Sequence, residues 1–157
     1  MYFRLQKAAR EWFRDISKDM PLDFDIYYLC LMTGLASGRK AEASQADTTD
    51  LTNDFPGVYR IKGRIITAFF LSQELKQLGI SFTEKGALHT AIRGLVDPLS
   101  SSHLSDQGIK EINKYSFGGF EVLTEYFAKK HLDRPRNLET FLPMYKELIG
   151  EFGTTDN

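Results

Sequence analysis

The sequence predicts an all-α fold, a single compact helical bundle of about six or seven helices. Apolar residues recur three or four positions apart along most of the chain, as they do on one face of an α-helix. Glycine or proline follows several of these segments, and both residues commonly end helices. No two alternating apolar segments around a tight turn predict a β-hairpin. With 157 residues the chain has the length of one domain, so we expect a domain over residues 1–150 and a frayed tail over 151–157.

The first helix is expected over residues 2–18, where Leu5, Trp12 and Ile16 share one face. Pro21 ends it, because proline disfavours a helical conformation in the residue before it. A second helix is expected over residues 24–36. Its residues are apolar nearly all round, which is typical of a helix buried in the middle of a domain. We expect Asp23 to be its N-cap and Gly38 to end it.

Residues 41–54, "AEASQADTTDLTND", form a long acidic loop between the second and third helices. This segment contains four acidic residues, no basic residue and few large apolar groups. Such a composition predicts a solvent-exposed, mobile loop. Fourteen residues without regular structure are unusual in a compact domain, so an ordered binding loop is the alternative.

Two helices are expected in the middle of the sequence. After Pro56, apolar residues recur at helical spacing as far as Leu78, and Gly79 follows as a stop. A strand over residues 60–70 competes, since Ile, Thr and Phe favour strands, but the length of the segment favours a helix. Ser81 and Glu84 then form an S-x-x-E capping box ahead of a helix that Pro98 closes.

The last third of the chain predicts two or three further helices. Ser105 is an expected N-cap, flanked by apolar residues that form a hydrophobic staple, so a helix should begin at Asp106 and reach Tyr115 or beyond. The helical pattern resumes over residues 120–127. Asn137 caps a final helix through Ile149, in which Pro143 produces a kink or a late start.

The stretch "SFGGF" places Gly118 and Gly119 inside this helical pattern. Each glycine in a helix interior costs roughly 1 kcal/mol relative to alanine, so some compensation is expected. One interpretation is a helix break, with a glycine in the left-handed conformation. A second is close packing, in which the missing Cβ atoms let another helix approach, and a third is a ligand phosphate bound by bare backbone amides.

No motif predicts catalysis, a cofactor or a metal site. The segment "GLASGRKA" lacks the spacing and the residues of a phosphate-binding loop. His89, His103 and His131 are far apart in sequence and belong to no zinc-binding pattern. Cys30 lies in an apolar segment, where a thiol is usually a small buried hydrophobe. We therefore expect a protein that is not an enzyme and needs no cofactor.

Basic residues are concentrated in two places, and these are the candidate binding residues for a polyanion or an acidic partner. In the first expected helix, basic residues three or four positions apart would form one stripe. The stripe comprises Arg4, Lys7, Arg10, Arg14 and Lys18. The second concentration comprises Lys129, Lys130, Arg134 and Arg136. If the two concentrations lie side by side, they form a groove that could bind phosphates. The alternative is that the basic residues only form a solvent-exposed helix face.

The whole composition limits the partners. The formal net charge of −1 excludes a generally basic protein that coats nucleic acid. There is no apolar segment of membrane-spanning length and no signal-peptide pattern, so we expect a cytoplasmic protein without a membrane partner. Aromatic residues make up 13% of the chain, more than one narrow buried face on each helix would hold. They predict either exposed binding surfaces or a thick aromatic core.

These observations lead to two functional hypotheses. The first is a non-catalytic interaction or accessory subunit of a larger cytoplasmic assembly, with a protein partner or a second copy of the chain bound to it. The alternative is a nucleic-acid-associated subunit of a bacterial DNA-processing or phage-defence complex, with the basic stripe on the DNA. Binding that weakens steeply with salt would favour the alternative.

Overall fold

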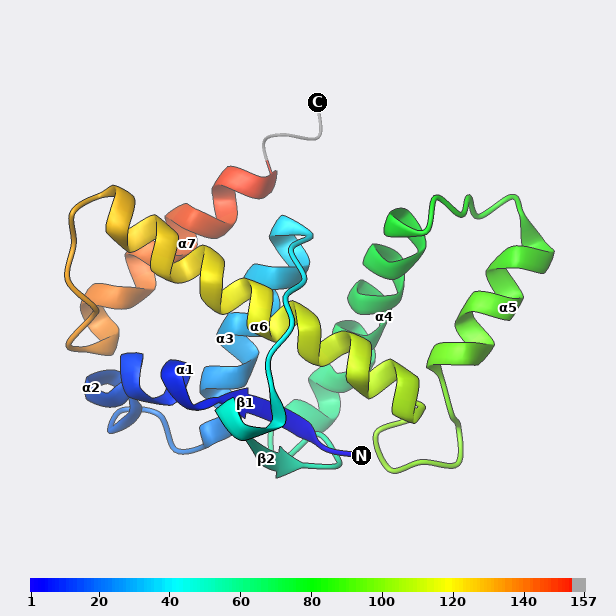
Figure 1. Cartoon of the computed structure of the whole chain (residues 1–157), viewed down its shortest axis with the longest axis horizontal. Coiled ribbons are helices and arrows are strands. Elements are labelled where there is room, and N and C mark those ends of the chain that lie inside the picture. Colours follow the sequence, from blue (N-terminus) through cyan, green and yellow to red (C-terminus); the bar gives the residue numbers. More distant parts are fainter. Residues whose placement is uncertain (154–157) are drawn as a thin grey trace. The chain divides into compact units, whose positions relative to one another are not determined.

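A computed structural model describes residues 1–153 and confirms the all-α class (Figure 1). The described residues contain seven α-helices, as expected, and one two-stranded sheet. They fall into two compact units. Unit 1 comprises Met1–Phe3 and Thr52–Ile112, and unit 2 comprises Arg4–Leu51 and the chain from Asn113 onward. The elements in chain order are β1 (Phe3–Gln6), α1 (Lys7–Trp12), α2 (Arg14–Ser17), α3 (Asp23–Ser37), the 3-10 helix η1 (Gln45–Asp47), β2 (Thr48–Thr52), α4 (Tyr59–Gln77), α5 (Lys85–Leu95), α6 (Asp106–Lys129) and α7 (Leu138–Gly153).

The prediction of one helix over residues 2–18 is wrong. The chain begins with β1, which pairs with β2, and α1 and α2 follow as two short helices. Along β1 buried Phe3 and Leu5 alternate with half-buried Arg4 and Gln6, a period of two that only a strand produces. Phe13 separates the two helices, with backbone angles of φ −87° and ψ 6°. The basic residues of this region therefore do not share one helix.

The acidic segment 41–54, expected as a long exposed loop, includes regular structure. It contains η1 and the whole of β2. Its start is held to α6, because the amide of Ala41 donates to the carbonyl oxygen of Lys114 at 3.0 Å. The carboxylate of Glu42 pairs with the ammonium group of Lys114 at 3.2 Å. Local composition predicted exposure, and these contacts attach the segment to a distant helix.

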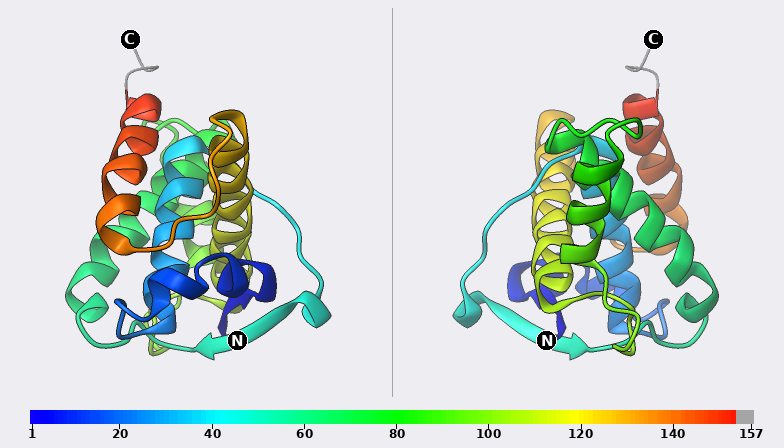
Figure 2. Two further views of the ribbon diagram at one scale, coloured as in Figure 1. Left: turned by 90° about the vertical axis from the view of Figure 1, so that its left-hand side faces the viewer. Right: turned by 90° about the vertical axis from the view of Figure 1, so that its right-hand side faces the viewer.

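Helix α3 forms the middle of unit 2, between α6 and α7 (Figure 2). It is apolar nearly all round and has nine buried residues, as expected for a central helix. The N-cap is Leu22 and not Asp23, and the Asp25 carboxylate accepts a hydrogen bond from the Leu22 amide at 2.9 Å. Gly38 ends the helix in the left-handed conformation, with φ 73°, as predicted.

Helix α6 runs unbroken through "SFGGF", so the expected helix break is not present. A Cβ atom added to Gly119 would lie 1.7 Å from the carbonyl oxygen of Cys30 in α3. One added to Gly118 would lie 2.3 Å from the carbonyl oxygen of Arg39. In return Gly34 of α3 faces the backbone of Tyr115. The glycines therefore allow the backbones of α3 and α6 to pack in direct contact.

An aromatic cluster around Trp12 fills the core of unit 2. The Trp12 ring meets Phe127 edge-on, with centroids 5.1 Å apart. Phe13 meets Phe141 edge-on at 5.5 Å. Most aromatic residues of the chain are buried in this way, and Tyr2 and Phe82 are the large aromatic side chains found exposed within residues 1–153. Of the two interpretations of the aromatic content, the structure supports the thick core.

Unit 1 is built from α4, α5 and the first residues of α6. The helical interpretation of residues 60–70 is correct, since they lie inside α4. The Glu84 carboxylate reaches the Ser81 amide at 3.4 Å as the capping box predicts, but α5 begins only at Lys85. After α5, a β-bridge joins Val96 to Leu104. This bridge closes the loop that precedes α6.

The helix caps predicted near the end of the sequence are present. The Ser105 hydroxyl accepts a hydrogen bond from the Gly108 amide at 2.9 Å at the start of α6. The Asn137 side chain accepts one from the Thr140 amide at 2.8 Å before α7, which includes Pro143. Residues 151–153 belong to α7 and are not a tail. The rest of the expected frayed tail, residues 154–157, lies outside the described residues.

Candidate functional site

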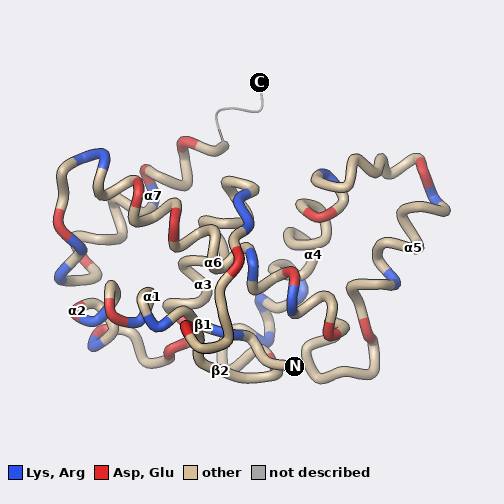
Figure 3. The backbone as a smooth tube through the Cα atoms, in the orientation of Figure 1, with Lys and Arg blue, Asp and Glu red and all other residues tan. Residues whose placement is uncertain are grey.

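The first basic concentration is interleaved with acidic residues around α1 and α2 (Figure 3). Its members come from β1, α1, α2 and the residue after α2, because the expected single helix does not form. The chain places Arg4 on β1, Lys7 and Arg10 on α1, Arg14 on α2 and Lys18 directly after it. Whether these residues form one basic surface therefore depends on what each side chain contacts.

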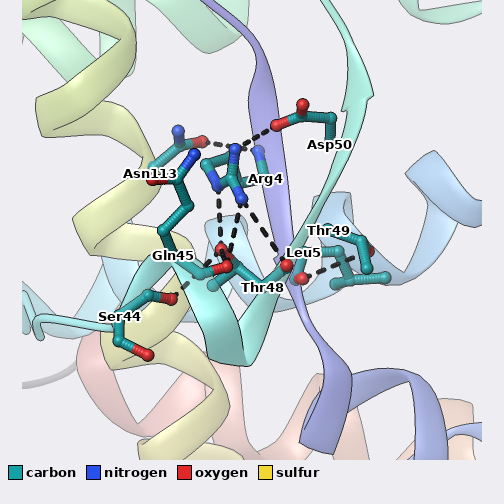
Figure 4. A network of polar contacts seen from close by, with 8 residues as sticks. All are labelled: Arg4, Leu5, Ser44, Gln45, Thr48, Thr49, Asp50 and Asn113. Carbon is teal, nitrogen blue, oxygen red and sulfur yellow. Dashed lines mark hydrogen bonds and ion pairs between the residues drawn. The ribbon is translucent and has the colours of Figure 1, made fainter.

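Arg4 is the centre of a network that holds segment 41–54 in place (Figure 4). Its guanidinium group pairs with the Asp50 carboxylate, and its Nε donates to the Thr48 hydroxyl at 2.8 Å. Its backbone amide donates to Oδ1 of Asn113 at 3.1 Å, and the buried Tyr27 hydroxyl donates to the same oxygen at 2.9 Å. Arg4 is thus occupied by contacts within unit 2.

Three further members of the stripe also have partners within unit 2. The Lys7 ammonium group donates to the carbonyl oxygen of Ala46 at 2.7 Å. Arg10 donates to the Asp23 carboxylate at 2.9 Å. Arg14 pairs with the Glu11 carboxylate at 2.5 Å. Carboxylates and a carbonyl oxygen of the same unit thus engage these cations, so the stripe is not a surface of unpaired cations.

One residue of the second concentration, residues 129–136, lies beside the first, and adjacency was the condition on which the groove depended. Arg134 makes the connection, since its guanidinium nitrogens lie 3.5 Å from the Glu11 carboxylate and 3.7 Å from that of Asp15. Lys130 pairs with Glu147 at 3.3 Å and lies over the Tyr126 ring. The structure therefore brings the two basic segments together through acidic residues.

Three of the nine predicted binding residues have no charged or hydrogen-bonding partner within residues 1–153. All three are exposed to solvent. They are Lys18, Lys129 and Arg136. These three side chains are the cations of the predicted site that remain for an external anion.

Unit 1 contains a cavity of about 810 Å³ that the sequence did not indicate. One wall is a face of α4 with Arg60 and Arg64, which are one helical turn apart. The segment between α5 and α6 also lines the cavity, as does Phe55. The lining residues are Asp54, Phe55, Arg60, Gly63, Arg64, Thr67, Ala68, Leu71, Val96, Pro98, Ser101, Ser102 and His103.

Local contacts fix the shape of this cavity. The buried Phe55 ring packs against Gly63, where an added Cβ would lie 2.8 Å from the ring. The Ser101 hydroxyl donates to the carbonyl oxygen of Asn53 at 3.2 Å, which ties the two sides of the opening. His103 has a φ of 62°, in the left-handed region that residues other than glycine seldom adopt. Its Nδ1 lies 3.3 Å from the carbonyl oxygen of Pro98.

The charges of the cavity are unbalanced. Arg60 and Arg64 are exposed, and neither guanidinium group has an acidic or hydrogen-bonding partner within residues 1–153. Asp54 is the one acid of the lining, and its carboxylate accepts a hydrogen bond from the Phe55 amide at 2.7 Å. The lining thus combines two arginines with several apolar side chains. The spacing in "YRIKGR" was visible in the sequence, but nothing local distinguishes these arginines from paired ones.

A second surface of α4 is apolar and exposed. Ile61 is 86% exposed, Ile65 is 73% exposed and Val58, just before the helix, is 66% exposed. Their spacing of three and four residues places them on one helix face. We call Val58, Ile61 and Ile65 the apolar face of α4. Leaving large aliphatic side chains in water is unfavourable, and contiguous patches of this kind mark binding surfaces.

Burial raises the pKa of three titratable side chains in unit 2. Burial raises the pKa of the Cys30 thiol, so it remains protonated and unreactive at neutral pH. Burial likewise raises the pKa of the Tyr27 and Tyr145 hydroxyls. Within residues 1–153 no three His, Cys, Asp or Glu side chains are grouped so that they could hold a metal ion.

Comparisons with known proteins identify no relative of the chain. No protein-family model matches it, and neither the curated proteins nor the solved structures include a match. Among residues 1–153 no helix combines the length and the hydropathy needed to cross a membrane. The class that the structure defines is therefore an all-α protein with two surface features in unit 1, a basic cavity and an apolar helix face.

Proposed function

We propose that the chain is a non-catalytic accessory subunit that binds a partner protein through the apolar face of α4. One observation carries the proposal, the exposure of Ile61 and Ile65 on a well-formed helix. Most aromatic residues are buried, and the other strongly exposed apolar side chains, Leu78, Phe82 and Leu99, are not spaced along one helix face. An assembly in the cytoplasm is the setting that the composition favours.

The charges of α4 favour an acidic partner. Every exposed charged side chain of this helix is basic, and its one acid, Glu74, is buried. The bases are Arg60, Lys62, Arg64 and Lys76. An apolar stripe bordered by cations is complementary to an amphipathic helix whose apolar residues are bordered by carboxylates. We therefore propose such a helix, in a different protein, as the occupant of this face.

The test begins with a photo-crosslinking amino acid at position 61, expressed in the native host. The crosslinked protein is then purified, and its binding to the purified chain is measured by titration calorimetry. We expect a one-to-one complex that a peptide of the partner's acidic helix reproduces. Ile61→Asp and Ile65→Asp should each weaken it at least tenfold, because they place a carboxylate in an apolar, acid-flanked contact.

The matched control is Leu132→Asp, which introduces the same charge at an exposed aliphatic side chain in unit 2, outside the apolar face of α4. It should leave the complex unchanged. Crosslinks only between copies of the chain would contradict the proposal and indicate a homo-oligomer. A complex that the two isoleucine variants bind as well as the parent would also contradict it.

A nucleic-acid-associated subunit is the second proposal. It is supported by Lys18, Lys129 and Arg136, exposed cations without a partner within residues 1–153. Pairing of the other six predicted residues with acids, carbonyl groups or an aromatic ring weighs against it, because a paired cation releases fewer counterions from a phosphate backbone. Substitution of all three free cations by Gln should abolish duplex binding if this proposal is right. A control with Lys85→Gln should not.

A further inference from the structure

We propose that the cavity of unit 1 binds a small phosphate monoester that carries an apolar or aromatic group. The cavity contains none of the apolar residues Val58, Ile61 and Ile65, but it shares Arg60 and Arg64 with the cations that border the apolar face of α4. Two features of the lining carry the proposal, the two arginines whose guanidinium groups have no partner within residues 1–153 and the apolar side chains.

The cations favour a doubly charged anion. Arg60 and Arg64 lie one turn apart on α4 and both line the cavity. Each guanidinium group has five N–H donors in a planar fork that suits phosphate oxygens. A single carboxylate is satisfied by one such fork. Two forks, with no acid paired to either within residues 1–153, match a phosphate monoester with its charge of nearly −2.

The segment between α5 and α6 supplies further polar groups. Ser101 and His103 of this segment line the cavity. The left-handed backbone of His103 is unfavourable for a side chain with a Cβ atom, and such conformations occur disproportionately at binding sites. Because Nδ1 of His103 faces the Pro98 carbonyl oxygen and donates to it, Nε2 of the neutral ring is an acceptor and suits a donor group of the ligand, not a phosphate oxygen.

The apolar lining of the cavity requires more than an inorganic ion. A volume of about 810 Å³ is in the range of pockets that hold drug-sized ligands. Phe55, Leu71, Val96 and Pro98 offer apolar surface to the body of the ligand. The arginines would then hold the phosphate, and the apolar group of the ligand would cover this surface. Inorganic phosphate alone would leave the apolar side chains of the cavity in contact with water.

The experiment uses the full chain and three probes, phenyl phosphate, benzoate and inorganic phosphate, with binding followed by calorimetry and by backbone amide NMR shifts. Phenyl phosphate should bind more tightly than the other two and shift the amides of residues 101–103. Arg60→Gln and Arg64→Gln should each weaken it about tenfold or more, since each removes charged hydrogen bonds.

Lys62→Gln is the matched control, because it removes one positive charge from the same helix between the two arginines and does not line the cavity. It should leave the affinity for phenyl phosphate unchanged. Circular dichroism of each variant separates loss of binding from loss of fold. The proposal is overturned by absence of saturable phenyl phosphate binding at millimolar concentration, by equal binding of benzoate, or by equal weakening in the Lys62 variant.

Discussion

The Cα hydrogen of Gly119 points at the carbonyl oxygen of Cys30, and a Cβ atom in its place would lie 1.7 Å from that oxygen. Real Cβ atoms do not approach a backbone oxygen so closely, and this oxygen belongs to the main chain, which cannot rotate away. The contact between α3 and α6 therefore depends on the missing side chain. It explains why a long helix contains two adjacent glycines in its interior.

Gly119→Ala is expected to destabilise the protein. The added methyl group forces α3 and α6 apart, and overpacking of a tight interior contact typically costs about 1–3 kcal/mol. The control is Gly94→Ala in α5, where nothing lies within 4 Å of an added Cβ. That change should stabilise the protein by up to about 1 kcal/mol through helix propensity. Urea unfolding measures both, and equal effects would contradict this account.

Arg4→Ala is expected to loosen segment 41–51. The substitution removes the hydrogen bond to Thr48 and the ion pair with Asp50, which together hold η1 and β2 against β1. Hydrogen exchange at residues 45–50 should accelerate, and the free energy of unfolding should fall by about 1–2 kcal/mol. Lys18→Ala, at a cation without a partner within residues 1–153, should change neither quantity.

The coupling between Arg4 and Asp50 can be measured separately with a double-mutant cycle. Asp50 is about half exposed, so solvent screening limits the ion pair to no more than about 1 kcal/mol. Most of the effect of Arg4→Ala should therefore persist in the Asp50→Ala background. If the effect vanishes there, the ion pair and not the Thr48 bond orders the segment.

Tyr27 is expected to make the protein sensitive to alkali. Burial, and then the nearby Cys30, raise the pKa of its hydroxyl well above the ordinary value of 10.0. A group whose pKa is raised by folding contributes stability that is fully present below its unfolded pKa and is lost at higher pH. The free energy of unfolding should therefore fall above about pH 10.

The variant Tyr27→Phe tests this assignment. It removes the ionisable hydroxyl and the hydrogen bond to Asn113, so it should be about 1 kcal/mol less stable at pH 7. Its stability should decline less steeply than that of the parent between pH 10 and 11. Parallel curves for the two proteins would show that Tyr27 does not contribute to the alkaline transition.

Cys30 is expected to resist modification in the folded protein. The side chain is fully buried, and burial raises its pKa, so neither access nor thiolate formation favours reaction. A chromogenic disulfide reagent should react with it at the rate of unfolding in water and at once in guanidinium chloride. Gly119→Ala should accelerate the reaction in water, because it separates the helices that cover the thiol.

The elements that the sequence predicted well depend on local features. Helix α3 is recognisable from its apolar residues and from Gly38, and the starts of α6 and α7 from the side chains of Ser105 and Asn137. Periodicity and capping act within a few residues, so they can be read without the fold. The sequence did not predict the strand over residues 3–6, because this strand depends on pairing with β2, more than forty residues away.

The candidate sites show the same division. The sequence by itself determined that the chain is helical, that its cations are concentrated on a few segments and that Gly118 and Gly119 need compensation. Only the tertiary structure decided that Arg4 is paired and that Arg60 and Arg64 are not. Arginines are alike in a sequence, and their electrostatic state depends on which distant acids the fold brings within a few ångströms.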